Sequence, residues 1–480
     1  MLDGFFALIF VPTKYPFTLQ TKSPSPRGRG NKGEGINHLK NSMLAGALFA
    51  GAVHGNAPQP VPAHTFSFTT PIAMPPTRVR HLALLITFLA IGLTGCASDS
   101  DADHDVLDQT WEAIEAEAEG TSLTMMMWMG DPAINDYMAD FVVPELKTRY
   151  GIELDIVSGQ GSQIVSTLLS EIESGRSTSQ LDLIWLNGET FFQLREIDAL
   201  FGPFTDALPH SEYVDYDDPF IGIDFQQPID GYEAPWGNVQ FTLIYDSAVV
   251  ESPPQTPEEL ATWVQEHPGT FTLPNEFAGM TLLKSLMMAK AGPETLYGPF
   301  DEAAYEKWSS ELWTYLNDLK PYFWRSGRTF PRTLSQQHQL FSSGEVAFTM
   351  SNNDSEVDNK VAQGVFPESS RAYVLESGTI QNSHYLGIPK HSDNKAAALV
   401  AINFMMSPEA QYEKIQPDVW GDGTVLDRDR LPSEWQQRFD DIPGRERAPD
   451  RADIEPYAQQ ELAPEYMMRL SDDFRTYVME

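Results

Sequence analysis

A chain of 480 residues is long enough to form two compact lobes behind a processed leader, and its charge is unevenly distributed. Residues 1–95 hold eight Lys or Arg and two Asp or Glu, which leaves 24 basic against 66 acidic residues in 96–480, a formal net charge of −42. So negative a surface repels nucleic acid, which is therefore excluded as a partner. The single cysteine, Cys96, excludes an intrachain disulfide.

Residues 74–95 have the pattern of an export signal. A short basic segment with Arg78 and Arg80 precedes the mostly apolar residues 82–93, a length typical of a signal-peptide core and too short to span a bilayer. The segment ends in the tetrapeptide Leu-Thr-Gly-Cys96, which resembles a bacterial lipobox. The resemblance implies that the thiol of Cys96 is lipidated and that the mature chain begins there. We therefore predict a periplasmic or other extracytoplasmic protein, attached to a membrane through this lipid.

The segments around this signal have no pattern of a folded domain. Residues 96–106 form a polar tether without apolar periodicity, which cannot bury enough surface to fold. Residues 1–73 are rich in Pro, Gly and Ser and carry a basic cluster. We interpret them as an artefact of the assigned start site, with translation beginning at Met74, or as a disordered leader if they are translated.

The first half of the mature chain alternates helices and strands. Apolar periodicity predicts helices at 107–119, from 131 to about 150, from 162 to 174 and from 188 to 194. Nearly continuous apolar runs predict strands at 123–128, 152–157 and 181–186. This alternation is typical of a parallel sheet flanked by helices, in which ligands bind beyond the carboxyl ends of the strands.

The second half begins with a long strand-like run. Further strands are predicted at 239–246, 270–273, 345–350 and within 378–388. Helices are predicted from Thr256, at 279–291, 301–318, 355–363 and 394–406. The last seventy residues are charged and broken by prolines, so only short helices are expected there.

Two stretches resemble the segments by which type II periplasmic binding proteins cross between their lobes. The first covers 240–260 and the second 385–410. A more specific similarity, to YnjB-type extracellular binding proteins, extends over most of 121–440. It is carried by the motifs GDPAIN at 130–135, WLNGE at 185–189, APWG at 234–237, YFWR at 322–325 and DVWGD at 418–422. The chain departs from this pattern at Met129, where a glycine is expected.

This resemblance implies an α/β fold of two lobes, each with a mostly parallel sheet flanked by helices, joined by crossing hinge strands. Lobe 1 is expected to comprise 107–238 and 378–480, and lobe 2 to comprise 239–377. The alternative for the C-terminal part is that it is shared between the lobes. Such proteins capture a small solute between the lobes and deliver it to the permease of an ABC importer. A monomer without a cofactor or metal is expected. A thiamine-like or sulfur-containing solute is the usual guess for the family.

A cleft that closes on a solute needs aromatic walls and a few orienting amides and hydroxyls. The residues at the predicted strand ends and hinges that fit this description are Trp128, Asp131, Asn187, Trp236, Ser351, Asn352, Asn353, Asn382 and Tyr385. Structural roles are the alternatives. The tryptophans can pack in a core, Asn187 can serve a turn, and Asp131 and the 351–353 cluster can cap helices.

Two other classes of function remain open. Thiaminase-like enzymes share this fold but use a cysteine nucleophile, and the only cysteine here is the predicted lipid site. Hydrolase and nucleotide-binding motifs are absent from the sequence, and no Tyr-Tyr pair of the kind used by ferric-ion binding proteins occurs. A protein that presents its ligand to a membrane sensor would have the same clamshell, so sequence does not separate it from an importer subunit.

Overall fold

The computed structural model describes residues 106–480, in which two large apolar cores define two lobes. The core of lobe 1 includes Met125 and Leu399, and the core of lobe 2 includes Leu283 and Tyr466. The predicted signal peptide, the lipidation site at Cys96 and residues 1–73 lie outside the described part of the chain. The predicted tether also lies outside it, except for Val106, which is buried against lobe 1.

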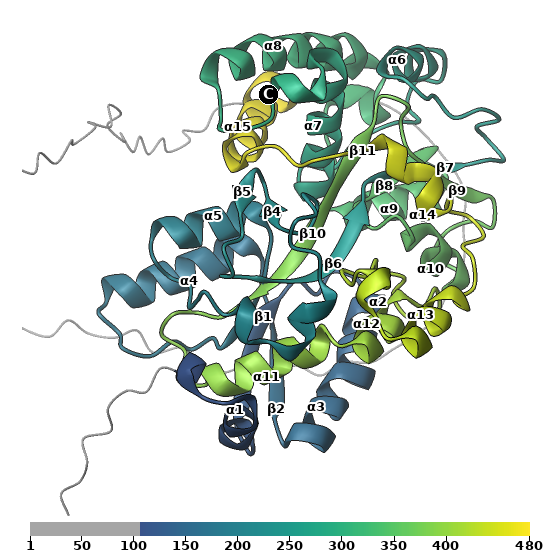
Figure 1. The fold of residues 1–480 in the computed structure, drawn as a ribbon. Helices are drawn as coiled ribbons and strands as arrows, with labels where there is room; N and C mark the ends of the chain where they lie inside the picture. Colours follow the sequence, from purple (N-terminus) through teal and green to yellow (C-terminus); the bar gives the residue numbers. More distant parts are fainter. Residues whose placement is uncertain (1–105) are drawn as a thin grey trace, which may run out of the picture. The chain divides into compact units, whose positions relative to one another are not determined.

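The sheet of lobe 1 begins with the expected parallel strands. These are β1 (Ser122–Met127), β2 (Glu153–Ser158) and β3 (Leu183–Leu186), and β1 pairs in parallel with both others. Two longer strands, β10 (Thr379–Gly387) and β6 (Ala234–Gln240), extend the sheet in antiparallel fashion. The carboxyl ends of the three parallel strands therefore lie at one edge, next to the strands that lead toward lobe 2 (Figure 1).

Helices cover both faces of this sheet (Figure 1). They are α1 (Trp111–Ala118), α2 (Pro132–Tyr137), α3 (Val143–Tyr150), α4 (Gly161–Glu173), α5 (Gly188–Glu196), α11 (Lys395–Met405), α12 (Pro408–Ile415) and α13 (Ser433–Asp440). Helix α11 is apolar on all sides and is buried from Ala396 onward, as expected of a central helix. The single helix predicted from 131 to 150 is interrupted by a π-helical turn at Met138–Val142, because Pro144 has no N–H to continue the α-helical ladder.

The sheet of lobe 2 differs from the predicted parallel arrangement. Its central strand β7 (Thr242–Asp246) pairs antiparallel with both β8 (Phe348–Ser351) and β9 (Ser370–Tyr373). The physical reason is that β7 arrives from the other lobe and inserts between two strands that run in the opposite direction. Residues 270–273, predicted as a strand, are buried but form only isolated backbone bonds, such as Ala347 N to Thr270 O at 2.7 Å.

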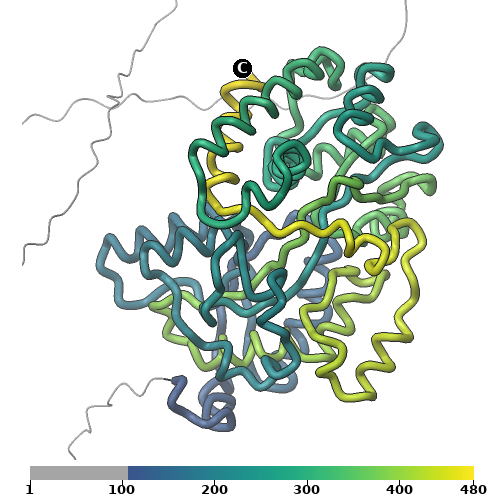
Figure 2. Tube along the Cα trace, turned by 45° about the horizontal axis from the view of Figure 1, so that its top comes forward, coloured from purple at the N-terminus to yellow at the C-terminus, as the bar shows by residue number. Residues whose placement is uncertain are grey.

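Lobe 2 is completed by helices from two distant parts of the chain. They are α6 (Pro257–Glu266), α7 (Phe277–Ala291), α8 (Glu302–Leu319), α9 (Leu334–Ser342), α10 (Glu356–Ala362), α14 (Arg451–Ile454) and α15 (Pro464–Phe474). Figure 2 shows the C-terminal segment passing from α13 beside lobe 1 to α15 in lobe 2. Residues from Leu462 to Val478 thus pack in the core of lobe 2. The expectation assigned 378–480 to lobe 1, with sharing of its C-terminal part between the lobes as the alternative.

The run predicted as one strand at 239–246 is divided between the lobes at Phe241. Before it, β6 pairs with β10 in the sheet of lobe 1, and after it, β7 enters the sheet of lobe 2. The amide of Phe241 donates to the carbonyl of Ile380 at 2.8 Å, so the crossing chain remains tied to β10. Strand β10 reaches both lobes, since its start pairs in parallel with β11 (Ala458–Gln459) and its end pairs with β3. The lobes are therefore joined by β6–β7 and β10.

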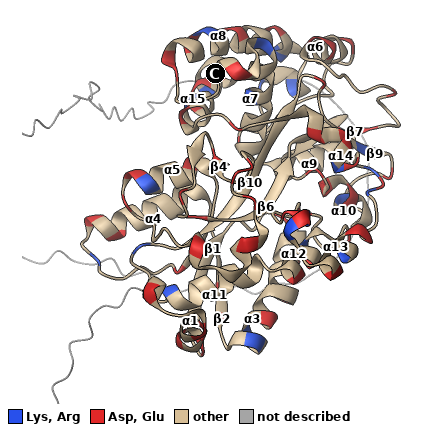
Figure 3. Cartoon of the chain, in the orientation of Figure 1, with Lys and Arg blue, Asp and Glu red and all other residues tan. Residues whose placement is uncertain are grey.

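Acidic residues occur on the outer helices of both lobes, for example on α1 and α8 (Figure 3). This distribution agrees with the strongly negative charge of residues 96–480. Within residues 106–480, no helix combines the length and the apolar character needed to cross a membrane.

Candidate functional site

The residues predicted after β1 take up defined positions at the edge of the sheet. The indole of Trp128 is half-buried against the core of lobe 1 and lies over Gly130, where a Cβ atom would approach the ring to 2.3 Å. A side chain at Gly130 would therefore displace the tryptophan. Asp131 caps α2, since its Oδ1 accepts a hydrogen bond from the Ala133 amide at 2.8 Å.

Asn187 follows β3 and precedes α5, as predicted. Its side chain does not cap the helix, and its Oδ1 instead accepts a hydrogen bond from the Thr190 hydroxyl at 3.3 Å. The side chain is half-buried, which is compatible with either the turn role or the ligand-binding role.

Two of the three predicted hinge residues are fully buried. Trp236 belongs to the core of lobe 1, and the hydroxyl of Tyr385 donates to the carbonyl of Ile221 at 2.9 Å. Asn382 is half-buried on β10 opposite Val239. In the conformation described, Trp236 and Tyr385 thus pack as core residues and present no free surface to a solute.

The predicted cluster at the end of β8 forms a hydrogen-bonded turn. The hydroxyl of Ser351 accepts a bond from the Asn353 amide, and Oδ1 of Asn353 accepts one from the Ser355 amide, both at 2.9 Å. Asn352 is half-buried in this turn. The turn also touches lobe 1, because Nδ2 of Asn353 donates to the carbonyl of Trp420 at 3.4 Å.

An ion pair that the sequence did not predict joins the two lobes. Nζ of Lys360, on α10 of lobe 2, lies 2.6 Å from Oδ2 of Asp131 in lobe 1 and 3.6 Å from Oε1 of Glu356. The three side chains are at most 11% exposed. On the same helix, Nδ2 of Asn359 donates to the carbonyl of Trp420 at 2.7 Å. Helix α10 therefore fastens lobe 2 to lobe 1.

The two carboxyl groups next to Lys360, those of Asp131 and Glu356, differ in their pKa values. Burial and the negative charge of Asp131 raise the pKa of Glu356 to about 8, in spite of the nearby ammonium. Burial also opposes ionisation of Asp131, but the charge and hydrogen bond of Lys360 outweigh it and lower the pKa of this carboxyl. Burial lowers the pKa of His338, whose Nδ1 lies 3.7 Å from Oε1 of Glu356, to about 4. At neutral pH, Lys360 thus pairs with one ionised carboxylate.

This arrangement predicts a pH dependence of stability. Because the pKa of Glu356 is higher in the folded than in the unfolded protein, its contribution to stability falls as pH rises from about 4.5 to about 8, by up to about 1.4 kcal/mol per pH unit. Glu356→Gln keeps a donor toward Asp131 but does not titrate, so it is expected to flatten this part of the profile and to stabilise the protein at pH 8. Urea unfolding at several pH values measures this, and equal slopes for both proteins would contradict it.

Three of the motifs that carry the resemblance meet in an aromatic cluster. Ring centroids of Trp185 and Trp236 are 5.1 Å apart, and those of Trp236 and Trp420 are 5.2 Å apart. The imidazole of His384 packs against all three tryptophans, at 5.0 to 5.7 Å. These rings fill the space between them. The cluster is tightly packed beside the crossing strands. The backbone carbonyl of Trp420 accepts hydrogen bonds from Asn359 on α10 and from Asn353 in the turn before it.

A buried charge pair lies against this cluster. The ammonium of Lys414 contacts Oδ2 of Asp422, and it lies 5.2 Å from the ring centroid of Trp420. Nε2 of His384 is 3.3 Å from the same carboxylate oxygen. Gly237 has to lack a side chain, because a Cβ atom there would come within 2.0 Å of Oδ2 of Asp422. The motifs at 234–237 and 418–422 are thus complementary in space.

Sequence reasoning missed several residues of this region. The Glu356–Lys360 spacing is one turn of a helix, which predicts a local pair but not its partner in the other lobe. His384 and Lys414 have no local signal at all. Within the described residues, no three His, Cys, Asp or Glu side chains are placed to hold a metal ion.

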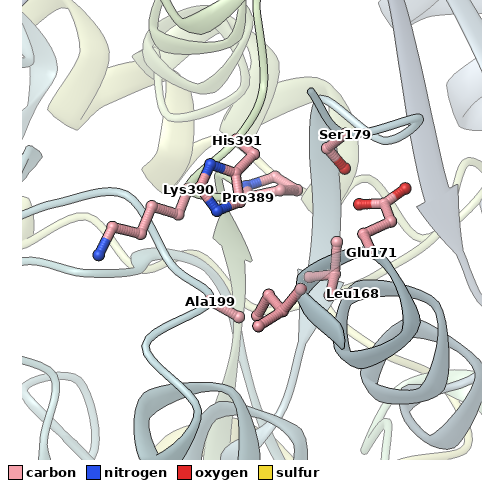
Figure 4. A pocket seen from close by; sticks show the side chains of 8 residues that line it. Leu168, Glu171, Ser179, Ala199, Pro389, Lys390 and His391 are labelled. Atoms are coloured by element: carbon pink, nitrogen blue, oxygen red, sulfur yellow. The ribbon is translucent and has the colours of Figure 1, made fainter. Parts of the chain in front are cut away.

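One hollow of the surface lies in lobe 1 alone, away from the predicted site. It is formed between α4 and the loop at 389–391, with Leu168 and Glu171 on one side and Lys390 and His391 on the other (Figure 4). None of the nine predicted ligand-binding residues lines it.

Known proteins share this fold and parts of this sequence. An ABC transporter substrate-binding protein from Bradyrhizobium japonicum is 15% identical with a TM-score of 0.55, and the match covers 75% of this chain and 100% of that one. The spermidine/putrescine substrate-binding protein PotD of Streptococcus pneumoniae is 17% identical with a TM-score of 0.52, covering 75% and 99%. These similarities confirm the predicted fold class of periplasmic binding proteins.

The sequence comparisons are more specific. Protein YnjB of Escherichia coli (strain K12) is 36% identical over 360 residues, which cover 74% of this chain and 89% of that protein. The family model for bacterial extracellular solute-binding proteins matches residues 142–438. Both matches extend over most of the two lobes, and they confirm the resemblance inferred from the motifs. This chain belongs to the family of bacterial extracellular solute-binding proteins.

Proposed function

We propose that this chain captures a small solute between lobe 1 and lobe 2 and delivers it to the membrane subunits of an ABC importer. The observation that carries the proposal is the connection of two separate cores by β6–β7 and β10, with α10 contacting the loops after β1 and α12 of the other lobe. Bending at Phe241 and within 378–388 would separate these contacts without disturbing either core. A bound solute favours the closed form through the contacts it adds there.

The remaining parts of the proposal concern the chain's surroundings. Membership in an extracellular family supports a location outside the cytoplasm. The lipobox-like tetrapeptide ending at Cys96 supports attachment to a membrane through a lipid. In this proposal the protein is a monomer that delivers its solute to the permease. A binding role without catalysis is proposed, because the family consists of transport proteins and the sequence offers no free thiol for a thiaminase-like reaction.

The proposal is tested by a thermal-shift screen of the full chain, purified in mild detergent. The panel contains thiamine and its phosphates, sulfur oxyanions, amino acids, short sugars and diamines, the last because a protein of similar fold is a spermidine/putrescine-binding protein. A solute at a hundred times its dissociation constant adds about 2.7 kcal/mol to the free energy of unfolding, which raises the melting temperature measurably.

A solute found in this screen should also make the protein more compact in X-ray scattering, because closure brings the lobes together. Asn187→Ala is expected to weaken its binding if this residue lines the cleft. Chemical conversion of a solute by the purified protein would instead favour the enzyme alternative. Binding without transport in a strain that carries the permease would favour a sensor partner.

A further inference from the structure

A second group of buried charges lies between the lobes, separate from the Lys360 pair. Asp224 and Glu233, in lobe 1, are 2% and 0% exposed. Glu461 and Lys284, in lobe 2, are 4% and 0% exposed and form an ion pair with 2.7 Å between Nζ and Oε2. In addition to burial, the charge of Glu461 raises the pKa of Asp224, and the charge of Asp224 raises the pKa of Glu233, as expected of carboxylates buried in the same region. None of them was predicted as a site residue.

The two carboxylates of lobe 1 are unpartnered. Both oxygens of Asp224 and both of Glu233 are buried, and none of the four accepts a hydrogen bond. Buried carboxylates normally accept several hydrogen bonds or pair with a cation, because desolvating an isolated one costs several kcal/mol. Burial and the neighbouring carboxylates raise the pKa of both groups well above the ordinary value. The pair is therefore poorly satisfied by the protein itself.

The acidic groups of this region outnumber its cations. Lys284 is paired with Glu461, and Arg195 attracts Glu233 while its guanidinium stacks on the Tyr232 ring at 3.5 Å. The region thus holds the carboxyl groups of Asp224, Glu233 and Glu461 but only two cations, Lys284 and Arg195. A fourth acidic residue, Glu189, is close enough for the charge of Lys284 to act on the pKa of its carboxyl group.

The hairpin that carries Asp224 links this region to lobe closure. Strands β4 (Ile223–Asp224) and β5 (Gln227–Pro228) belong to lobe 1, but Phe225 at the tip is fully buried in the core of lobe 2. The side-chain Nε2 of Gln226 donates to the backbone carbonyl of Glu461 at 2.7 Å. Phe225 and Gln226 both have positive φ angles, 46° and 63°, a strained geometry for residues other than glycine that tertiary contacts must maintain.

The aromatic surroundings suit an organic cation. The ammonium of Lys284 lies 4.7 Å from the ring centroid of Phe225 and 5.5 Å from that of Phe277. Aromatic faces attract ammonium groups through their quadrupole, and this attraction is strongest where water is excluded. Separation of the lobes, as proposed above, would withdraw Phe225 from the core of lobe 2 and expose Asp224 to a solute.

We propose that Asp224 and Glu233 form the part of the binding site that recognises a positively charged ammonium group of the solute. This inference rests on the proposed solute-binding function and specifies its substrate class. A cationic solute would supply the partner that these carboxylates lack when the hairpin seats in lobe 2. An anionic solute would add to the negative charge of the region.

The test uses four probes with a four-carbon skeleton and different end groups, namely 1,4-diaminobutane, 4-aminobutanoate, succinate and 1,4-butanediol. Binding to the full chain is measured by thermal shift and by titration calorimetry. Stabilisation is expected with 1,4-diaminobutane, and none with succinate or the diol. Asp224→Asn and Glu233→Gln are each expected to weaken diamine binding at least tenfold. Glu196→Gln removes the same charge from the exposed side of α5 and is expected to leave binding unchanged.

Both site variants should fold, because each removes repulsion from a buried cluster, and an unchanged or higher melting temperature without solute verifies this. Binding of diamine by Asp224→Asn with wild-type affinity would overturn the proposal. So would a preference for succinate or the diol, or the lack of any shift with 1,4-diaminobutane. If another solute of the wider panel binds in those cases, the proposed solute-binding function stands and only the cationic class is wrong.

Discussion

Replacing Lys414 with methionine is expected to lower the free energy of unfolding by about 3 to 5 kcal/mol, the cost of leaving one buried charge without its partner. Lys414 is 0% exposed and Asp422 1% exposed, and both lie in lobe 1. Because both partners belong to the same lobe, a movement of the hinge does not separate them, so it is not expected to relieve the loss. Lys414 also donates to the carbonyl of Gly423 at 2.9 Å, and that bond is lost as well. Urea unfolding measures the difference.

The matched control is the double variant Lys414→Met with Asp422→Asn. It removes both charges, so much of the lost stability is expected to return, although His384 loses its contact with the carboxylate. A double variant as unstable as Lys414→Met alone would show that the loss came from packing against Trp420 and not from the unpaired Asp422.

Replacing Lys360 with methionine is expected to open the lobes with little change in the melting temperature of either. Its removal leaves Asp131 buried and unpaired in the closed form, at a cost of about 3 kcal/mol or more. Because Asp131 lies in lobe 1 and Lys360 in lobe 2, separation of the lobes returns the carboxylate to water. A difference of about 3 kcal/mol changes the ratio of closed to open protein by more than a hundredfold.

X-ray scattering of the solute-free protein measures this opening as a larger radius of gyration. The matched control is Lys147→Met, which removes a lysine from an exposed pair with Glu153 and is expected to change neither scattering nor stability. If Lys360→Met lowers the melting temperature as much as Lys414→Met and leaves the radius unchanged, the Asp131 pair is a structural ion pair and not a latch between lobes.

The two lysine variants together test whether the lobes move as separate bodies. One pair lies within a lobe and the other between lobes, and both are similarly buried. In a hinged protein, removal of the pair between the lobes increases the radius of gyration and removal of the pair within a lobe lowers the stability. In a rigid protein, both replacements lower the stability and neither changes the radius of gyration. This comparison needs no knowledge of the solute.

The sequence by itself predicted the class of fold and most of its local elements. Asp131-Pro132 and Thr256-Pro257 are strong helix starts, and both begin helices in the structure, with each side chain capping as expected. The parallel strands of lobe 1 were recognised from apolar runs. These signals are local, because caps and apolar periodicity depend on residues within one or two turns. The family resemblance rested on short motifs of the same kind.

Only the tertiary structure decided what these elements contact. The division of 239–246 at Phe241 depends on pairing with β10, more than a hundred residues later, since an apolar run has the same pattern in one strand or two. The pair of Asp131 and Lys360 joins positions separated by 229 residues. The contact of Gln226 with Glu461 forms only because a hairpin of lobe 1 seats in lobe 2. Charge and burial at such sites are set by the three-dimensional neighbourhood, on which local sequence carries no information. The sequence therefore provided no signal for Asp224 and Glu233 or for the partner of Asp131, and the nine residues predicted to bind the solute stay a prediction.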